Sequence, residues 1–130
     1  MQVLIVESDA VLADRWFDEL STAGCDVHVA SSAQQAIRVM DACKVAVIVL
    51  DLELAAGGSL SVPIYAGYRL PDARIIVLTG STVFNDGSIF DLCANACAYL
   101  NTATRPGDLA ALVDYHGQRG TRINPARAVH

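Results

Sequence analysis

The sequence predicts a doubly wound α/β fold with a five-stranded parallel sheet and five helices. The first observation is an unbroken apolar run at residues 45–50, VAVIVL, which is too short for a helix and does not alternate with polar residues. Such a run is typical of a strand that is buried on both faces, as in parallel sheets covered by helices. The second observation is that short apolar runs recur along the chain and alternate with segments of helical periodicity. This alternation indicates parallel strands joined by crossover helices.

The first half of the chain is predicted to form three strands and two helices. Residues 2–6 (QVLIV) and 25–30 (CDVHVA) are predicted strands, and the second is an outer one. Between them, residues 9–23 have apolar side chains at helical spacing, and Gly24 provides a left-handed stop. Ser31 or Ser32 caps a second helix that runs to about residue 43. The apolar positions are Val11, Leu12, Trp16, Phe17 and Leu20 in the first helix and, on the buried face of the second, Ala33, Ala36, Ile37 and Met40.

The second half continues the alternation of strands and helices. Pro63 suits the first turn of a short helix that runs through about residue 69, and residues 74–78 (RIIVL) form a fourth buried strand. A weaker helix is predicted over residues 86–95 and a fifth strand over residues 97–101 (CAYLN). A last helix is predicted over residues 104–115, with inward-facing apolar residues at Leu109, Leu112 and Val113.

Length and composition favour one compact domain. The chain has 130 residues, of which 53% are hydrophobic and 18% charged, and this balance excludes wholesale disorder. The net charge of −5 argues against nucleic acid or an anionic membrane as a partner. No apolar run approaches the roughly 18 residues that a membrane span needs. The four cysteines form no C-x-x-C pair, and with no signal peptide in view we expect reduced thiols in a cytoplasmic protein.

The end of the chain differs in charge from the rest. From Tyr115 onward there are three arginines and no acid. We therefore predict one folded domain over residues 1–116 and a basic, flexible tail over residues 117–130. An arm that binds a partner is the alternative for this tail.

Polar side chains follow the inner strands of the predicted sheet. Glu7 and Asp9 follow the first strand, Asp51 the third and Thr79 the fourth, while Tyr99 lies in the fifth. In a flavodoxin-like strand order of 2-1-3-4-5 the first and third strands are neighbours, so Glu7 and Asp51 face one another. Carboxylates that converge repel each other unless a cation joins them, and hard oxygen ligands suit Mg²⁺. The alternative for Asp51 is that it ends its strand and begins a solvated turn.

Four segments together resemble the receiver domain of bacterial two-component response regulators. VLIVES resembles the family's acidic pair, VIVLDLEL its phosphate-accepting Asp, IIVLTG its Thr or Ser, and AYLNTA its aromatic residue followed by Lys-Pro. The resemblance covers residues 2–115, and its specificity lies in the order and spacing of the four segments. It implies a signalling module in a phosphorelay and not an enzyme. Its implied partners are a histidine kinase or phosphotransfer protein and a downstream output protein.

The resemblance also implies roles for five residues. Asp51 would be the nucleophile that accepts the phosphoryl group. Mg²⁺ would be held by Glu7, by Asp51 and by the backbone carbonyl of Glu53. Thr79 would hydrogen-bond a phosphate oxygen, and Tyr99 would swing inward as Thr79 moves, which changes the surface of the last helix and strand.

The sequence departs from the family pattern at the acidic pair and at the lysine. Ser8 replaces the second acid, so the affinity for Mg²⁺ should fall. Thr102 and Ala103 replace Lys-Pro, and Lys44, the chain's single lysine, lies before the third strand at the opposite edge of the sheet. Asp9 is one residue too late for the missing acid, and it can instead cap the first helix.

Two functions remain open, and a third is disfavoured. The residues Asp51, Thr79 and Tyr99 favour an atypical stand-alone receiver that is phosphorylated on Asp51. The missing acid and lysine favour a pseudo-receiver that binds proteins without phosphorylation. A nucleotide-binding flavodoxin-like enzyme is disfavoured because no Gly-rich loop follows the first strand. We expect no output domain in a chain of 130 residues, and a homodimer through the last helices and strands is a hypothesis.

Overall fold

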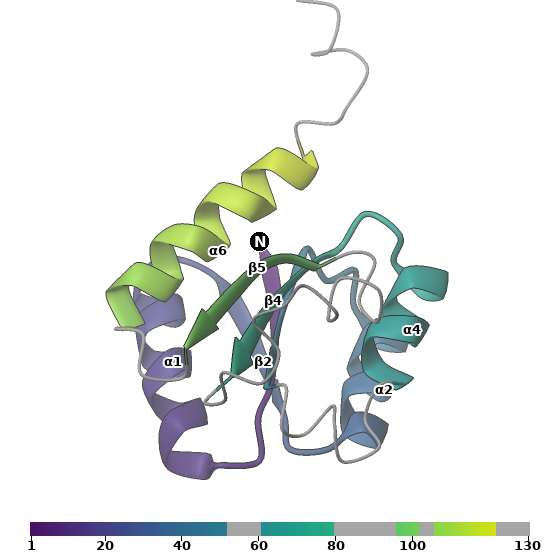
Figure 1. The fold of residues 1–130 in the computed structure, drawn as a ribbon, viewed down its shortest axis with the longest axis horizontal. Coiled ribbons are helices and arrows are strands. Elements are labelled where there is room, and N and C mark those ends of the chain that lie inside the picture. Colours follow the sequence, from purple (N-terminus) through teal and green to yellow (C-terminus); the bar gives the residue numbers. More distant parts are fainter. Residues whose placement is uncertain (52–60, 80–95, 102–105, 122–130) are drawn as a thin grey trace, which may run out of the picture.

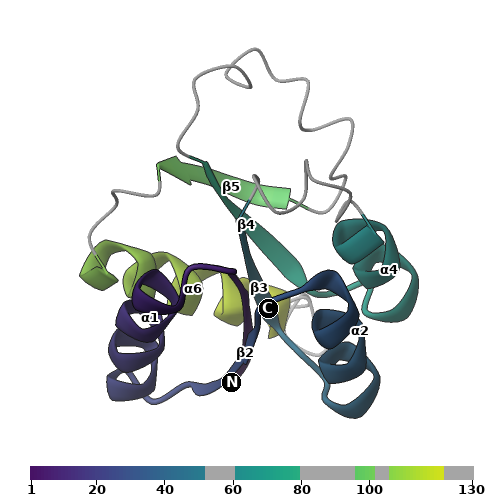
Figure 2. The ribbon, with the colours of Figure 1, turned by 90° about the horizontal axis from the view of Figure 1, so that it is seen from below.

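The computed structural model describes residues 1–51, 61–79, 96–101 and 106–121. The predicted helix over residues 86–95 lies outside these ranges. Within them the chain forms three layers, with a sheet in the centre and a pair of helices on each face (Figures 1 and 2).

The central layer is a five-stranded sheet in which all neighbouring strands run parallel. Its order is β2-β1-β3-β4-β5, so the predicted order 2-1-3-4-5 is confirmed. The central strand β3 ends one residue later than predicted, because Asp51 still pairs with Leu78 of β4. The strands are β1 (Gln2–Val6), β2 (Asp26–Ala30), β3 (Val47–Asp51), β4 (Arg74–Thr79) and β5 (Ala96–Asn101).

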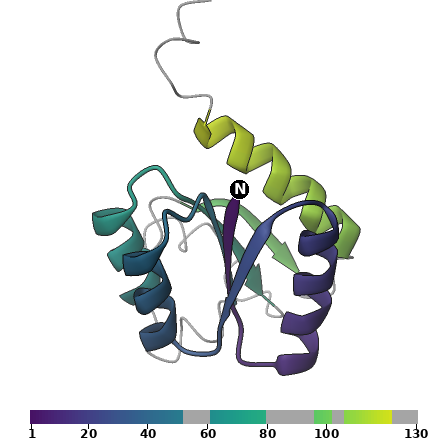
Figure 3. The ribbon, with the colours of Figure 1, turned by 180° about the vertical axis from the view of Figure 1, so that it is seen from behind.

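Four helices are described, two on each face of the sheet. One pair is α1 (Ala10–Thr22) with α6 (Pro106–Thr121), and the other is α2 (Ala33–Ala42) with α4 (Ser61–Arg69). Figure 3 shows the two pairs on opposite sides of the sheet, with the N-terminus near α6. No helix within the described ranges has both the length and the apolar character that crossing a membrane requires.

The ends of the first two helices follow from local chemistry. The Ser32 hydroxyl accepts a hydrogen bond from the backbone N–H of Gln35 at 3.2 Å and so caps α2. After α1 the chain turns at Gly24, whose φ of 95° is in the left-handed region that favours glycine. Both features were predicted from the sequence.

The end of α6 was predicted wrongly, because the helix continues six residues past Tyr115 to Thr121. A contact far away in sequence explains the difference. Gly117 is buried against the start of the sheet, where an added Cβ would collide with the Met1 side chain and lie 3.4 Å from Val47 Cγ2. Packing on β1 and β3 therefore stabilises a turn that the weak helix propensity of glycine argues against.

The hydrophobic core lies on both faces of the sheet, which is why the inner strands β1, β3 and β4 are largely apolar. Successive side chains of a strand point to opposite faces, and here both faces are covered by helices. On α1 the core is filled by Trp16 and Leu20, whereas Val11 and Phe17 are 73% and 38% exposed. The core beneath α1 and α6 consists of Val3, Ile5, Trp16, Leu20, Val47, Val49, Ile76, Leu78, Leu109 and Val113. The core beneath α2 and α4 includes Leu4, Val6, Ala36, Met40, Ile48, Leu50, Val62, Ala66, Ile75 and Val77.

Candidate functional site

Two carboxylates lie side by side at the carboxyl ends of the neighbouring strands β1 and β3. Val6 pairs with Leu50 across these strands, and the next residue on each is Glu7 or Asp51. Glu7 is 3% exposed and Asp51 is 6% exposed, and they are the buried charged residues of the described ranges. The predicted convergence of Glu7 and Asp51 is therefore present, and the alternative that Asp51 begins a solvated turn does not fit its burial.

Glu7 is held in place by the chain that follows it. Its Oε1 accepts a hydrogen bond from the backbone N–H of Asp9 at 3.2 Å. Its Oε2 is buried and has no hydrogen-bond partner of normal geometry among the described residues. A buried carboxylate oxygen without a partner is costly. The atom therefore calls for a proton or a cation.

The environment of Glu7 favours its protonated form when no cation is present. Burial, followed by contact with the carboxyl group of Asp51 and by the charge of that group, raises the pKa of Glu7 to about 8. The hydrogen bond from the Asp9 backbone acts in the opposite direction but is outweighed. Two carboxyl groups that face each other in a buried site cannot easily both be ionised. Burial beside Asp51 therefore favours the protonated form of Glu7 at neutral pH.

The pair has the chemistry of a partial magnesium site. Carboxylate oxygens are hard ligands, and a cation would provide the partner that Glu7 Oε2 lacks. Glu53, whose backbone carbonyl was the third predicted ligand, lies outside the described residues. Among the residues that are described, no group of three acidic, histidine or cysteine side chains comes together. The described ligand set thus consists of two carboxylates.

Asp9 caps α1, which is one of the two roles predicted for it. Its Oδ1 accepts hydrogen bonds from the backbone N–H groups of Val11 at 3.0 Å and Leu12 at 3.2 Å. Ser8 and Asp9 are both exposed, unlike Glu7. Asp9 therefore contributes to the site through its backbone N–H, a contact that the sequence pattern did not indicate.

The strand register places Thr79 at the same end of the sheet as Asp51. Asp51 pairs with Leu78 of β4, and Thr79 is the next residue and the last of that strand. Across the next pair, Thr79 lies opposite Asn101 and Tyr99 lies opposite Val77, two positions before the end. The structure describes the backbone of Thr79 and Tyr99 but not their side chains. Thr102 and Ala103 lie outside the described residues.

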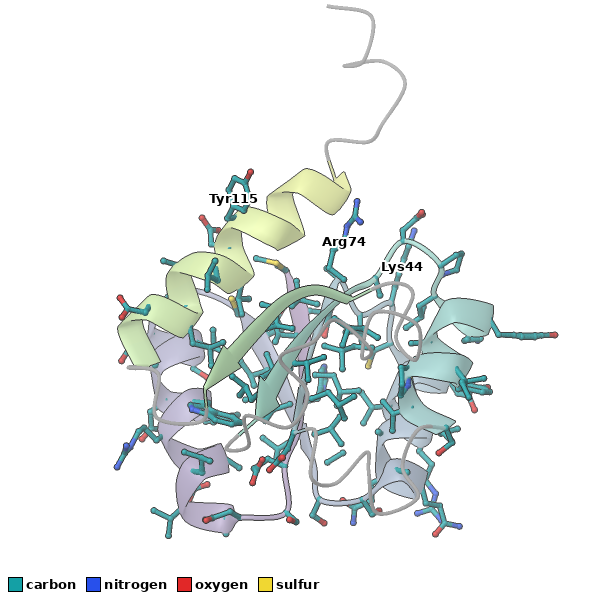
Figure 4. The ribbon with its side chains drawn as sticks, viewed as in Figure 1. Lys44, Arg74 and Tyr115 are labelled. Carbon is teal, nitrogen blue, oxygen red and sulfur yellow. The ribbon has the colours of Figure 1, made fainter. Side chains whose placement is uncertain are left out.

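The single lysine lies at the other end of the sheet. Figure 4 shows Lys44 and Arg74 at the edge from which the strands start, where Lys44 precedes β3 and Arg74 begins β4. A five-residue strand spans about 17 Å, so the length of β3 separates Lys44 from Asp51. The prediction that Lys44 cannot reach the site is thus confirmed.

Comparison with solved structures identifies the fold. The chain is similar to a CheY-like response regulator receiver domain protein from Methanospirillum hungatei, with a TM-score of 0.83 at 22% identity, over 95% of this chain and 98% of the other. It is also similar to a response regulator from Thermotoga maritima, with a TM-score of 0.78 at 21% identity, over 90% of this chain and 97% of the other. A third similar structure is NtrX from Brucella abortus, with a TM-score of 0.83 at 14% identity, over 98% of this chain but 28% of NtrX.

These likenesses establish that the chain has the fold of response regulator receiver domains. At such low identity they concern the fold and not the chemistry of the site. No protein-family model matches the sequence, and no curated protein matches it either.

Proposed function

We propose that this chain is an atypical receiver domain that accepts a phosphoryl group on Asp51 in two-component signal transduction. The observation that carries the proposal is the buried pair of Glu7 and Asp51, which a receiver fold holds at the carboxyl ends of β1 and β3. Burial of two carboxyl groups opposes stability. Their position at the carboxyl ends of β1 and β3 is therefore best explained by a chemical function.

Asp51 is the proposed nucleophile. One of its carboxylate oxygens forms a bond to phosphorus while the bond between phosphorus and the leaving group of the donor breaks. The backbone of Asp51 is paired with β4, which holds Asp51 at the carboxyl end of the sheet. Thr79, the last residue of β4, is the proposed partner of a phosphate oxygen, and Tyr99 is the proposed switch residue.

Glu7 and Asp51 are the proposed ligands of Mg²⁺, together with the backbone carbonyl of Glu53. Mg²⁺, when bound, supplies positive charge beside the phosphoryl oxygens. Glu7 must release its proton before it can act as a ligand, because the protonated carboxyl has lost its charge. With Ser8 in place of a second acid, we expect weaker binding of Mg²⁺ than in a receiver with both acids.

The partners follow from this proposal. The donor is a histidine kinase or a phosphotransfer protein, the signal passes to a downstream output protein, and this chain acts in the cytoplasm. The chain is then a signalling module and not an enzyme that turns over a substrate of its own.

A pseudo-receiver that binds proteins without phosphorylation is the second candidate. It is favoured by two observations at the site, namely the exposed Ser8 at the position of an acid and the distance of Lys44 from Asp51. In that case Glu7 keeps its proton and the pair never takes up a metal.

Phosphorylation itself separates the two candidates. The protein is incubated with Mg²⁺ and acetyl phosphate, and its intact mass is measured alongside that of Asp51→Asn. Asp14→Asn, which changes an exposed acid on α1, is the matched control. An adduct that forms on the unchanged protein and on Asp14→Asn but not on Asp51→Asn supports the receiver. Absence of the adduct from all three, with no NMR shift on addition of beryllofluoride, contradicts it and favours the pseudo-receiver.

A further inference from the structure

The outer surface of α4 carries two exposed large apolar side chains and, beside them, a half-buried tyrosine. Tyr68 and Ile64 on α4 are 78% and 67% exposed, and they lie one helical turn apart on the same side of the helix. The ring of Tyr65 stacks on that of Tyr68, with centroids 6.4 Å apart and an angle of 22° between the planes. Large apolar side chains that gather on a helix surface in this way are typical of protein interfaces.

Charged groups of both signs border this apolar stripe. Asp41 of α2 accepts a hydrogen bond from the Tyr65 hydroxyl, and its Oδ1 lies 3.7 Å from Arg69 Nε of α4. The side chains of Asp41 and Arg69 remain 52% and 50% exposed, so each can still contact a partner. The stripe and these two residues, Ile64, Tyr65, Tyr68, Asp41 and Arg69, are called the α2–α4 patch below.

The two helical layers differ in charge. Helices α1 and α6 contain five acids and two arginines, whereas α2 and α4 contain one acid and two arginines. In a two-fold dimer the same surface occurs on both subunits, so a surface with charge of one sign repels itself. The sequences of α1 and α6 carry net negative charge, so pairing this layer with a second copy of itself would bring an excess of like charge together. The α2–α4 patch, with one acid and one base beside an apolar stripe, is complementary to itself.

We propose that a second copy of this chain docks on the α2–α4 patch and forms a two-fold symmetric dimer. Asp41 of each copy faces Arg69 of the other, and the two pairs of tyrosine rings lie in the centre with Ile64. This dimer uses a different surface from the last helices and strands, which the sequence analysis favoured. It does not depend on phosphorylation of Asp51.

Charge reversal tests the arrangement, because each single variant should lose the ability to form a homodimer but should form a heterodimer with the other variant. Asp41→Arg has two cations in the patch and Arg69→Asp has two anions, so neither variant alone should dimerise. Mixed in equal amounts, they restore both predicted ion pairs. Sedimentation velocity of each variant, of the mixture and of the unchanged protein measures the association. We expect dimer for the unchanged protein and for the mixture, and monomer for each variant alone.

Apolar variants test the patch without the charges. Ile64→Ser and Tyr68→Ser should each weaken dimerisation by about tenfold or more, as for central residues of an interface. Val11→Ser on α1 is the matched control, because Val11 is 73% exposed on the other layer. Thermal unfolding of every variant verifies that it folds, and these exposed positions should change it little.

Four results would each overturn the proposal. The first is that the unchanged protein remains monomeric up to millimolar concentration. The second is that its dimer is unaffected by Ile64→Ser and Tyr68→Ser, and the third is that the dimer is lost in Val11→Ser. Either result places the interface elsewhere. The fourth is that Asp41→Arg and Arg69→Asp, both folded, do not associate when mixed. This result excludes an interface in which Asp41 of one copy contacts Arg69 of the other.

Discussion

The bodies and the tips of β1 and β3 are buried to nearly the same degree but are chemically opposite. Residues Val3 to Val6 and Val47 to Leu50 are apolar and 0% exposed, and the next residues, Glu7 and Asp51, are 3% and 6% exposed. Burial of the strand bodies stabilises the fold, because it removes apolar area from water. Burial of the tips opposes folding, because it removes ionisable groups from water. The same sheet thus provides stability along its length and a reactive environment at its end.

The largest effect is expected in the strand bodies. Ile48→Ala removes a fully buried side chain from the core beneath α2 and α4, and it should lower the free energy of unfolding by about 2–5 kcal/mol. Urea denaturation of the two proteins measures the difference. A loss below about 1 kcal/mol would contradict the description of this strand as part of a tightly packed core.

At the tips, the contribution of Glu7 to the free energy of unfolding should decrease as the pH rises. The folded state keeps a proton on Glu7 up to about pH 8, whereas the unfolded chain releases it near pH 4.5. Between these values the folded state binds more protons, so the contribution of Glu7 to stability is full below pH 4.5 and is lost as the pH rises through 8. The slope from this group is at most about 1.4 kcal/mol per pH unit.

Denaturation at several pH values, with EDTA present, measures this dependence, and Glu7→Gln provides the comparison. The amide does not titrate, so the decline between pH 5 and pH 8 should be smaller in Glu7→Gln than in the unchanged protein. Equal declines in the two proteins would show that Glu7 is not protonated in the folded state.

Mg²⁺ should stabilise the folded protein at the tips, because it favours the ionised carboxylates of Glu7 and Asp51. Because protons and Mg²⁺ compete for Glu7, the increase in melting temperature on addition of millimolar Mg²⁺ should be larger at pH 8 than at pH 6. Differential scanning fluorimetry of the unchanged protein and of Asp51→Asn measures it. An equal increase in both proteins would place the metal away from Asp51.

The smallest effect is expected at the opposite end of the sheet. Lys44 is exposed and precedes β3, so Lys44→Ala should change the free energy of unfolding by less than about 0.5 kcal/mol. It should also leave the yield of the acetyl phosphate adduct unchanged, because the length of β3 separates Lys44 from Asp51. A clear loss of adduct in Lys44→Ala would mean that charge acts across the whole sheet.

The fold was predictable because its signals are local or periodic. Unbroken apolar runs located the strands, and Ser32 and Gly24 marked ends of α2 and α1. The end of α6 was missed because it depends on the contact of Gly117 with Met1, which no local pattern contains. The exposure of Val11 was also not visible in the spacing, since neighbouring apolar residues compete for one narrow inward face.

The position of the candidate site was predictable, but its protonation was not. The strand order brings Glu7 beside Asp51, and that order is one of the common orders of doubly wound sheets. The raised pKa of Glu7 depends on how completely the surrounding side chains exclude water, which is a property of the packed molecule. The backbone hydrogen bond from Asp9 to Glu7 likewise depends on the conformation of the turn after β1.

The strand order also bears on how the chain folds as it is synthesised. Both neighbours of β1 are complete once residue 51 has been made, and α1 and α2 lie between these strands in the sequence. The first 51 residues thus contain three adjacent strands and one covering helix for each face, while β4 and β5 extend the sheet at one edge. Because chains emerge from the ribosome N-terminus first, Glu7 and Asp51 leave the ribosome before β4 and β5 do, and β4 and β5 then complete the sheet at one edge.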